Sequence, residues 1–234
     1  MKDPVFHFKY FSCRHAISSM KIGVDGVLLG AWANVSGSSI LDVGTGCGVI
    51  SLMCAQRNTT ATIYAIDKDE NSIKEAIINF QKSPWSERLE ATLEDFMHNN
   101  LNNLDLIISN PPFFNSGIKK PSTPREVARH QSSLSPAVIL DKGSNMLNDN
   151  GRISMILPFD QSDEIRLHAE SLGLKLIRAN YVKDHASSKP KRSLMEFAYS
   201  GEPVKSIETL VLHSADGAPS PEYKNLCKDF YLKF

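Results

Sequence analysis

The sequence predicts an α/β fold with a mostly parallel sheet, one antiparallel strand and helices on both faces. From residue 39 onward, short apolar runs alternate with longer segments of helical periodicity, which is typical of parallel strands joined by crossover helices. Two later runs, at residues 174–182 and 193–199, flank a short basic loop and are expected to pair with each other. Glycines, prolines and acidic residues follow several strands, at the edge where open α/β sheets bind ligands.

The expected elements follow in order along the chain. Residues 1–23 show no clear periodicity, and Asp25 is expected to cap a helix over residues 27–33. Ser135 and Pro136 supply the cap and the first-turn proline of a helix over residues 137–147. Strands are expected at residues 39–43, 62–67, 89–92, 104–108, 151–157, 174–182, 193–199 and 207–213. Further helices are expected at residues 49–55, 70–82 and 160–171, and at the start of residues 221–234.

The length and composition suit one compact unit. With 234 residues, of which 41% are hydrophobic, the chain can bury a full single-domain core. We expect an N-terminal extension with a capping helix at residues 1–38 and a catalytic domain at residues 39–234. The acidic and basic residues balance to a net charge of zero, which argues against indiscriminate binding of nucleic acid.

Simple patterns argue against membrane and metal functions. No run approaches the roughly 18 apolar residues of a membrane span, and the charged, aromatic start does not resemble a signal peptide. The four cysteines include no Cys-x-x-Cys pair and the seven histidines show no ligand spacing, so no metal is expected. We therefore expect a cytoplasmic protein.

A glycine-rich loop follows the strand at residues 39–43 and precedes a helical run. Glycines permit a tight turn and the close approach of a ligand to a helix start. Val49 stands where a dinucleotide-binding loop needs glycine, and the Gly-Lys-Ser/Thr of a P-loop is absent. The spacing resembles the cofactor loop of methyltransferases, in which a preceding acid orients the glycines. The residues predicted for this site are Asp42, Gly44, Thr45, Gly46 and Gly48.

Two further acids stand at the ends of the next strands. Asp67 ends the strand at residues 62–67, where a carboxylate can accept hydrogen bonds from both ribose hydroxyls of a nucleotide. Asp95 follows the short strand at residues 89–92. A surface acid after a strand is commonplace, so Asp95 gains its weight from its position in this series of strand-end motifs.

The strand at residues 104–108 leads into Ser-Asn-Pro-Pro-Phe-Phe. Two prolines remove two backbone donors and push Asn110 into an extended conformation. The resulting loop offers carbonyl and amide oxygens to a planar amino group, while an aromatic ring stacks on the base that carries it. The tetrapeptide Asn-Pro-Pro-Phe at residues 110–113 resembles the Asn-Pro-Pro-aromatic motif of amino-directed methyltransferases that use S-adenosylmethionine. The predicted catalytic residues are Asn110, Pro111, Pro112 and Phe113.

Basic residues cluster in two places despite the zero net charge. One group includes Arg129 and His130, in a long stretch at residues 114–134 that has no periodicity of its own. The second includes Lys189, Lys191 and Arg192, between the strands at residues 174–182 and 193–199. Both groups are expected at one rim of the sheet, where they would contact RNA phosphates or remain solvated loops.

The chain resembles the bacterial tRNA(Val) adenine-N6-methyltransferases. The resemblance rests on residues 20–32, with the sequence Met-Lys-Ile-Gly-Val-Asp-Gly-Val-Leu-Leu-Gly-Ala-Trp, on the Asn-Pro-Pro-Phe loop, on Ala-Arg-His at residues 128–130, and on residues 228–234. It implies a Rossmann-like class I methyltransferase sheet, the cofactor S-adenosylmethionine, and a monomer that methylates adenosine 37 of valine tRNA. In this family the acid at the position of Asp95 binds the cofactor adenine. Lys21, Lys68, Phe96 and Asn110 are also expected beside the cofactor.

Other activities are compatible with the same motifs. A guanine-N2 methyltransferase of rRNA and a glutamine-N5 methyltransferase of proteins use the same kind of loop. A cofactor-binding RNA factor without catalysis is a further alternative, although it would have no chemical need for the acceptors of Asn110 and Pro111. The basic clusters favour RNA over a protein substrate.

Overall fold

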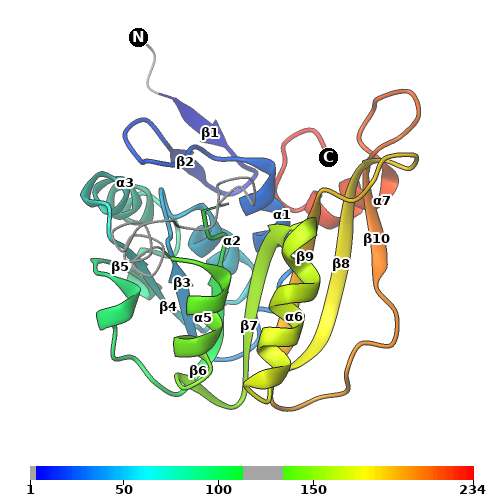
Figure 1. The fold of residues 1–234 in the computed structure, drawn as a ribbon. Coiled ribbons are helices and arrows are strands. Elements are labelled where there is room, and N and C mark those ends of the chain that lie inside the picture. The colour runs from blue at the N-terminus through cyan, green and yellow to red at the C-terminus, as the bar shows by residue number, and fades with distance from the viewer. Residues whose placement is uncertain (1–3, 113–133) are drawn as a thin grey trace, which may run out of the picture.

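A computed structural model describes residues 4–112 and 134–234, and an eight-stranded sheet forms its centre (Figure 1). The strands are β3 (Ser39–Val43), β4 (Thr62–Asp67), β5 (Leu89–Leu93), β6 (Leu104–Ser109), β7 (Leu147–Pro158), β8 (Lys175–His185), β9 (Arg192–Ala198) and β10 (Glu208–His213). They lie in the order β10-β8-β9-β7-β6-β3-β4-β5.

Strand β9 runs antiparallel to both of its neighbours, β7 and β8, whereas the other neighbouring pairs in this sheet are parallel. A short loop joins β8 to β9, and short loops join antiparallel strands, because a parallel pair needs a long crossover. The predicted mostly parallel sheet with an antiparallel strand is confirmed. The carboxyl ends of the parallel strands meet at one edge, called the carboxyl edge below.

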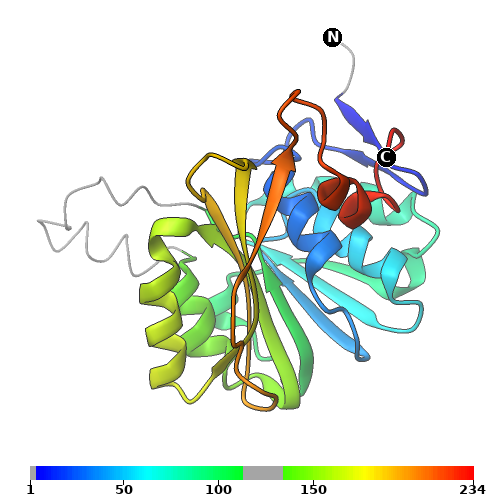
Figure 2. The same cartoon turned by 90° about the vertical axis from the view of Figure 1, so that its right-hand side faces the viewer.

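Helices cover both faces of the sheet, as predicted (Figure 2). One face carries α1 (Val24–Trp32), α2 (Val49–Arg57), α3 (Glu70–Gln81) and α7 (Pro221–Cys227). The other face carries α5 (Pro136–Gly143) and α6 (Ser162–Ser171). Three short 3-10 turns are η1 (Ser86–Arg88), η2 (Phe96–His98) and η3 (Phe159–Gln161).

The central strands are apolar on both faces, which is why the sheet can be covered twice. In β3, Ile40 packs with the helices α1 and α2, whereas Leu41 packs with α5 and α6. In β6, Leu106 and Ile108 join the first core and Ile107 joins the second. Successive side chains of a strand point to opposite faces, so a continuous apolar run is needed to fill two cores.

The N-terminal residues form a hairpin that their lack of periodicity concealed. Strand β1 (Val5–His7) pairs antiparallel with β2 (Ser12–Arg14). The prediction that Asp25 caps the following helix is wrong. Helix α1 begins at Val24, one residue before Asp25, and Gly23 occupies the N-cap position. Asp25 instead accepts a hydrogen bond from Arg192 Nε at 2.9 Å, a partner far along the chain that local spacing does not reveal.

The helix predicted over residues 137–147 is shorter in the structure. It ends at Gly143, and β7 already begins at Leu147. The amide of Leu104 donates to the Met146 carbonyl at 3.0 Å, and Leu104 pairs with Leu147 in the β6–β7 ladder. Strand pairing with β6 therefore overrides the local helical pattern at this point.

The hairpin and the C-terminal tail pack against each other on the face that carries α1. The amide of Lys9 donates to the Phe230 carbonyl at 2.9 Å, and Phe8 forms a β-bridge with Tyr231. The Phe8 and Tyr231 rings stack with centroids 6.2 Å apart. Phe230 is 2% exposed and belongs to the same core as α1 and α2. The two ends of the chain thus complete one hydrophobic core.

Replacing Phe230 by Ala should lower the free energy of unfolding by about 3–5 kcal/mol, because it leaves a cavity in this shared core. Urea unfolding followed by tryptophan fluorescence measures the loss. The matched control is Leu232→Ala, since Leu232 lies in the same tail and is 61% exposed. A Phe230→Ala variant as stable as the control would mean that the tail contributes little to the core.

Candidate active site

A cavity of about 430 Å³ opens at the carboxyl edge of the sheet. Its walls are formed by residues that end or follow β3, β4, β5 and β6, by Ser19 and Met20 from the segment before α1, and by Leu134 and Val138 before and within α5. The predicted site residues that line it are Gly44, Gly46, Asp67, Lys68, Asp95, Phe96, Asn110 and Pro112. These residues lie at or after the ends of four strands that are neighbours in the sheet.

The three glycines of the loop after β3 serve different purposes. All have positive φ angles, of 71° at Gly44, 57° at Gly46 and 84° at Gly48. A Cβ at position 48 would lie 2.5 Å from a Phe80 ring atom, so this glycine permits close packing of α2 against α3. A Cβ at Gly46 would meet nothing within 4 Å, and this residue lines the cavity. Gly46 thus leaves open space beside its backbone, which suits the approach of a ligand.

Asp42 anchors the glycine loop through hydrogen bonds to its side chain. Its Oδ2 atom accepts hydrogen bonds from the hydroxyls of Thr45 at 2.7 Å and Ser51 at 2.6 Å. The side chain is fully buried, and Oδ1 has no hydrogen-bond partner in the described part of the chain. Burial raises the pKa of Asp42 to about 6, although the Ser51 and Thr45 hydrogen bonds oppose the shift. Asp42, Thr45 and Gly48 are not among the cavity-lining residues, so they shape the loop from outside the cavity.

Asp67 joins the loop to the next strand. Its Oδ2 atom accepts from the Gly46 amide and its Oδ1 atom from the Asp69 amide, both at 2.9 Å. The amides of Gly44 and Thr45 donate to the Ile66 carbonyl at 2.9 and 3.0 Å. Burial raises the pKa of Asp67, while the two amide hydrogen bonds act in the opposite direction. Its carboxylate is therefore fixed in orientation at the cavity wall.

The residues after β5 form the next part of the wall. Asp95 caps η2 by accepting a hydrogen bond from the Met97 amide at 2.9 Å, which sets the direction of its side chain. Phe96 is 4% exposed and provides an apolar surface beside it. Glu94 also lines the cavity, and its Oε2 accepts from the Asn99 amide group at 2.7 Å. This wall thus offers two carboxylates and an aromatic ring to the cavity.

Asn110 follows β6, which lies on the side of β3 opposite to β4. The preceding hydroxyl, of Ser109, donates to the Val43 carbonyl at 2.7 Å and ties the end of β6 to the end of β3. The Oδ1 atom of Asn110 is buried and has no hydrogen-bond partner among the described residues. A buried acceptor without a donor costs about 1–3 kcal/mol. This oxygen is therefore ready to accept a hydrogen bond from a ligand in the cavity.

Some predicted residues lie elsewhere or outside the described part. Phe113, Arg129 and His130 lie outside the described residues. Lys21 is not among the residues that line the cavity, and its Nζ donates to the Ala16 carbonyl at 2.7 Å. The residues that line the cavity without having been assigned to the site are Ser19, Met20, Val43, Ile66, Asp69, Glu94, Leu134 and Val138. Most are apolar or carry no motif, and only Asp69, which follows Asp67 at a strand end, had a recognisable signal.

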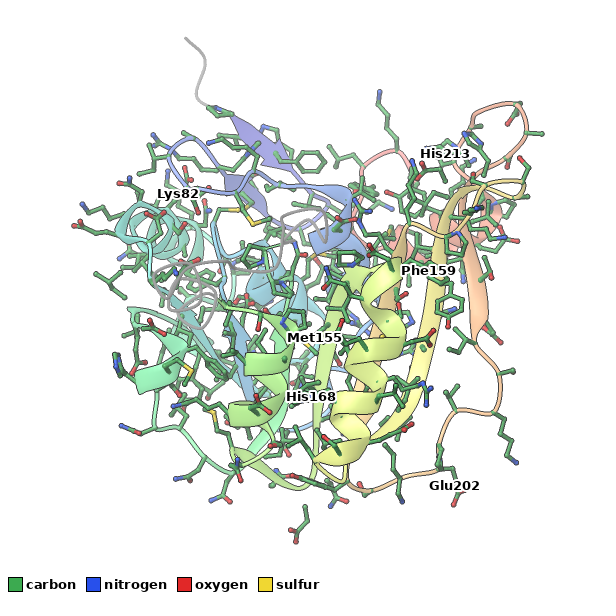
Figure 3. The ribbon with its side chains drawn as sticks, in the orientation of Figure 1. Lys82, Met155, Phe159, His168, Glu202 and His213 are labelled. Atoms are coloured by element: carbon green, nitrogen blue, oxygen red, sulfur yellow. The ribbon has the colours of Figure 1, made fainter. Side chains whose placement is uncertain are left out.

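The second basic group lies on the loop between β8 and β9, at the carboxyl edge. Figure 3 shows His213 at this edge and Glu202 at the opposite one. Lys191 Nζ donates to Asp184 Oδ2, and Arg192 Nε donates to Asp25 Oδ2. Lys189 is exposed. The loop is thus on the expected rim, but two of its three predicted phosphate contacts also form ion pairs within the protein.

The described residues contain neither a metal-binding cluster nor a helix that could span a membrane. Within residues 4–112 and 134–234, no group of three or more His, Cys, Asp and Glu side chains is placed to hold a metal ion. Within the same ranges, no helix has the length and apolarity needed to cross a bilayer.

Comparisons with known proteins agree with this geometry. Residues 25–161 match the family model described as the methyltransferase small domain. A tRNA1(Val) (adenine(37)-N6)-methyltransferase of Bacteroides fragilis is 40% identical over 100% of both chains. Proteins of the same name from Trichodesmium erythraeum and Flavobacterium johnsoniae are 39% and 38% identical, and each match covers 98% of this chain. The match covers 98% of the first relative and 100% of the second.

Solved structures share the fold. A predicted O-methyltransferase of Agrobacterium tumefaciens superposes with a TM-score of 0.70 at 16% identity, covering 88% of this chain and 96% of that one. The structure of P. horikoshii TYW2 in complex with MeSAdo gives a TM-score of 0.59 at 14% identity, covering 85% and 72%. The sheet is therefore that of the class I methyltransferases.

The buried Asp42 predicts a pH dependence of stability. Its folded-state pKa of about 6 lies above the ordinary value of 3.8, so the folded state binds this proton more tightly than the unfolded state. Stability should therefore fall as the pH rises from about 4 to about 6, by at most about 3 kcal/mol, and then level off. Asp42→Asn removes this titration, so urea unfolding of both proteins from pH 4 to pH 8 should give converging or crossing curves. Parallel curves would contradict the raised pKa.

Proposed function

The chain belongs to the family of tRNA1(Val) (adenine(37)-N6)-methyltransferases, and we propose that it transfers a methyl group from S-adenosylmethionine to N6 of adenosine 37 in valine tRNA. The full-length identity of 40% supports the assignment of base and position. The observation that carries it within the site is the buried Oδ1 of Asn110 at the cavity wall, which has no hydrogen-bond partner in residues 4–112 and 134–234. An exocyclic amino group is a donor that satisfies this oxygen.

The residues of the cavity fit the cofactor. Asp67 presents a fixed carboxylate to the ribose hydroxyls, and the open side of Gly46 admits a ligand against the backbone. Asp95 accepts from the adenine amino group, and Phe96 provides an apolar surface for the ring. Lys68 also lines the cavity and adds a positive charge near the carboxylates. When bound, S-adenosylmethionine supplies an electrophilic methyl group on a sulfonium centre.

The task of the chain is to make a poor nucleophile reactive. The lone pair on adenine N6 is delocalised into the ring, and the Asn-Pro-Pro loop contains no base stronger than an amide. Asn110 Oδ1 and the Pro111 carbonyl accept the two amino hydrogens, which favours a tetrahedral nitrogen with a localised lone pair. The same oxygens stabilise the positive charge that develops on nitrogen, and fixed placement supplies further acceleration. The amino proton then leaves to water.

In this proposal, the tRNA is bound by residues that follow the Asn-Pro-Pro sequence and by the loop between β8 and β9. Phe113 stacks on the target base, a contact worth about 1–3 kcal/mol by analogy with base–aromatic stacking. Splaying a base costs less in a single-stranded loop than in a duplex, which suits adenosine 37 in the anticodon loop. Arg129, His130 and the β8–β9 loop contact RNA phosphates in this proposal. We also propose that the protein acts as a monomer, in the cytoplasm where tRNA is modified.

The decisive experiment transfers tritiated methyl groups from S-adenosylmethionine to bacterial tRNA and identifies the labelled nucleoside. N6-methyladenosine in valine tRNA is the expected product. Asn110→Ala should lower the single-turnover rate by at least about a hundredfold and leave cofactor affinity within a few-fold, because its hydrogen bond matters chiefly in the transition state. The matched control is Asn225→Ala, on the exposed side of α7. N2-methylguanosine or labelled protein would favour the alternative activities, and an active Asn110→Ala variant would refute the acceptor mechanism.

The β8–β9 loop yields a second expectation. Lys189→Gln should weaken tRNA binding and reduce the slope of log affinity against log salt by about 0.7–0.9, the value for one phosphate contact. Lys191→Gln should have a smaller effect, because Lys191 is paired with Asp184. Filter binding across a salt series measures both, with Lys205→Gln in the β9–β10 connection as the control. A slope equal to that of the control would identify the loop as merely solvated.

A further inference from the structure

A buried carboxylate on α3 holds the segment that precedes α1. The side chain of Glu75 is 0% exposed, and its two oxygens accept hydrogen bonds from three consecutive amides. The donors are Ala16 at 2.6 Å, Ile17 at 3.3 and 3.2 Å to the two oxygens, and Ser18 at 2.8 Å. Residues 16–20 are called the wall segment below.

The opposite side of the wall segment is fixed as well. Lys21 Nζ donates to the carbonyls of Ala16 at 2.7 Å and Ser18 at 3.3 Å. The Ser18 hydroxyl donates to the Met20 carbonyl at 2.9 Å. Three amides of the wall segment therefore donate to the Glu75 carboxylate, and two of its carbonyls accept from the Lys21 ammonium group. These contacts restrict the backbone of the segment.

The wall segment reaches the cofactor cavity directly. Ser19 and Met20 line the cavity, and the Ser19 hydroxyl lies 3.3 Å from the Ser72 hydroxyl on α3. Ser72 in turn donates its amide and hydroxyl to Asp69 Oδ2, at 2.9 and 2.8 Å, and Asp69 lines the cavity too. Asn79 lies one turn after Glu75 on α3. Its Nδ2 donates to the carbonyl of Arg14, which precedes the wall segment, and to the carbonyl of Cys47 in the glycine loop, both at 2.8 Å.

The charge on Glu75 is maintained by these contacts. Burial raises the pKa of a carboxylate, but the hydrogen bonds from Ser18, Ala16 and Ile17 outweigh it, so the pKa of Glu75 lies below its usual value. Arg14 Nε lies 3.6 Å from Oε1 and adds a positive charge. Removing the carboxylate would leave three amides to find other partners, and the wall segment would have to rearrange.

We propose that Glu75 is a positioning residue that keeps residues 16–20 in place as a preformed wall of the cofactor cavity, and so sets cofactor affinity without touching the cofactor. The inference rests on the proposed function only in that the cavity takes S-adenosylmethionine. A wall that is already ordered loses no further conformational freedom on binding, whereas a loose segment must be ordered by the ligand. Glu75 is not among the cavity-lining residues, which distinguishes its role from that of Asp67.

The test compares Glu75→Gln with Glu70→Gln on the same helix. Glu70 forms a surface pair with Lys74 at 2.7 Å and its side chain is 67% exposed. Calorimetry with S-adenosylmethionine should show a dissociation constant raised at least about tenfold for Glu75→Gln and unchanged for Glu70→Gln. Turnover at saturating cofactor, and the KM for tRNA, should stay within about threefold. Hydrogen exchange should speed up in peptides that cover residues 16–20 and remain slow in β3 and β6.

Each result decides between the readings. A folded Glu75→Gln variant whose cofactor affinity lies within twofold of the parent would overturn the inference, and so would equal losses of turnover and affinity. If Glu75→Gln does not fold, Ser18→Ala replaces it, because that change keeps the three amide donors and removes the hydroxyl that donates to the Met20 carbonyl and also helps to lower the pKa of Glu75. It should raise the dissociation constant about threefold, and an unchanged value would overturn the inference. A parent protein that binds no S-adenosylmethionine would refute the proposed function instead.

Discussion

The pair of hydrogen bonds on Asp42 Oδ2 is the contact on which the site depends. It ties the glycine loop, through Thr45, and the start of α2, through Ser51, to the end of the central strand β3. Because the loop is held there, the Gly46 amide meets the carboxylate of Asp67, and β3 and β4 present one continuous wall. Burial of the Asp42 carboxylate is unfavourable, as its raised pKa indicates, and the hydrogen bonds from Ser51 and Thr45 offset part of that cost.

Carboxylates that accept several backbone amides recur as the means by which this chain holds irregular segments. Asp67 accepts two backbone amides at the cavity and Glu75 accepts three in the wall segment. At the opposite edge, Asp105 accepts the amides of Ser38 and Ser39 at the start of β3. Loops cannot satisfy their amides through a ladder, so an anion that takes several of them orders the backbone. In contrast, the buried Oδ1 of Asn110 accepts no hydrogen bond from the described residues.

Much of the architecture was predictable from local pattern. The apolar residues of β3 and β6 fill two cores, so the sequence carries strands that are apolar on both faces. The motif residues Gly46, Asp67 and Asn110 stand at or just after the ends of such strands. Less was predictable about boundaries. The end of α5 at Gly143 follows from the pairing of Leu147 with β6, a contact between residues far apart in sequence.

The sequence by itself determined the alternation of strands and helices along the chain from residue 39 onward and the antiparallel return of β9, because hydrophobic period and turn residues act locally. Only the tertiary structure decided which charges are used inside the protein. Asp25 pairs with Arg192, and the amides of the wall segment find Glu75 more than fifty residues away. Such partners are selected by packing in three dimensions, and hydrogen bonds between distant residues leave no periodic trace in the chain.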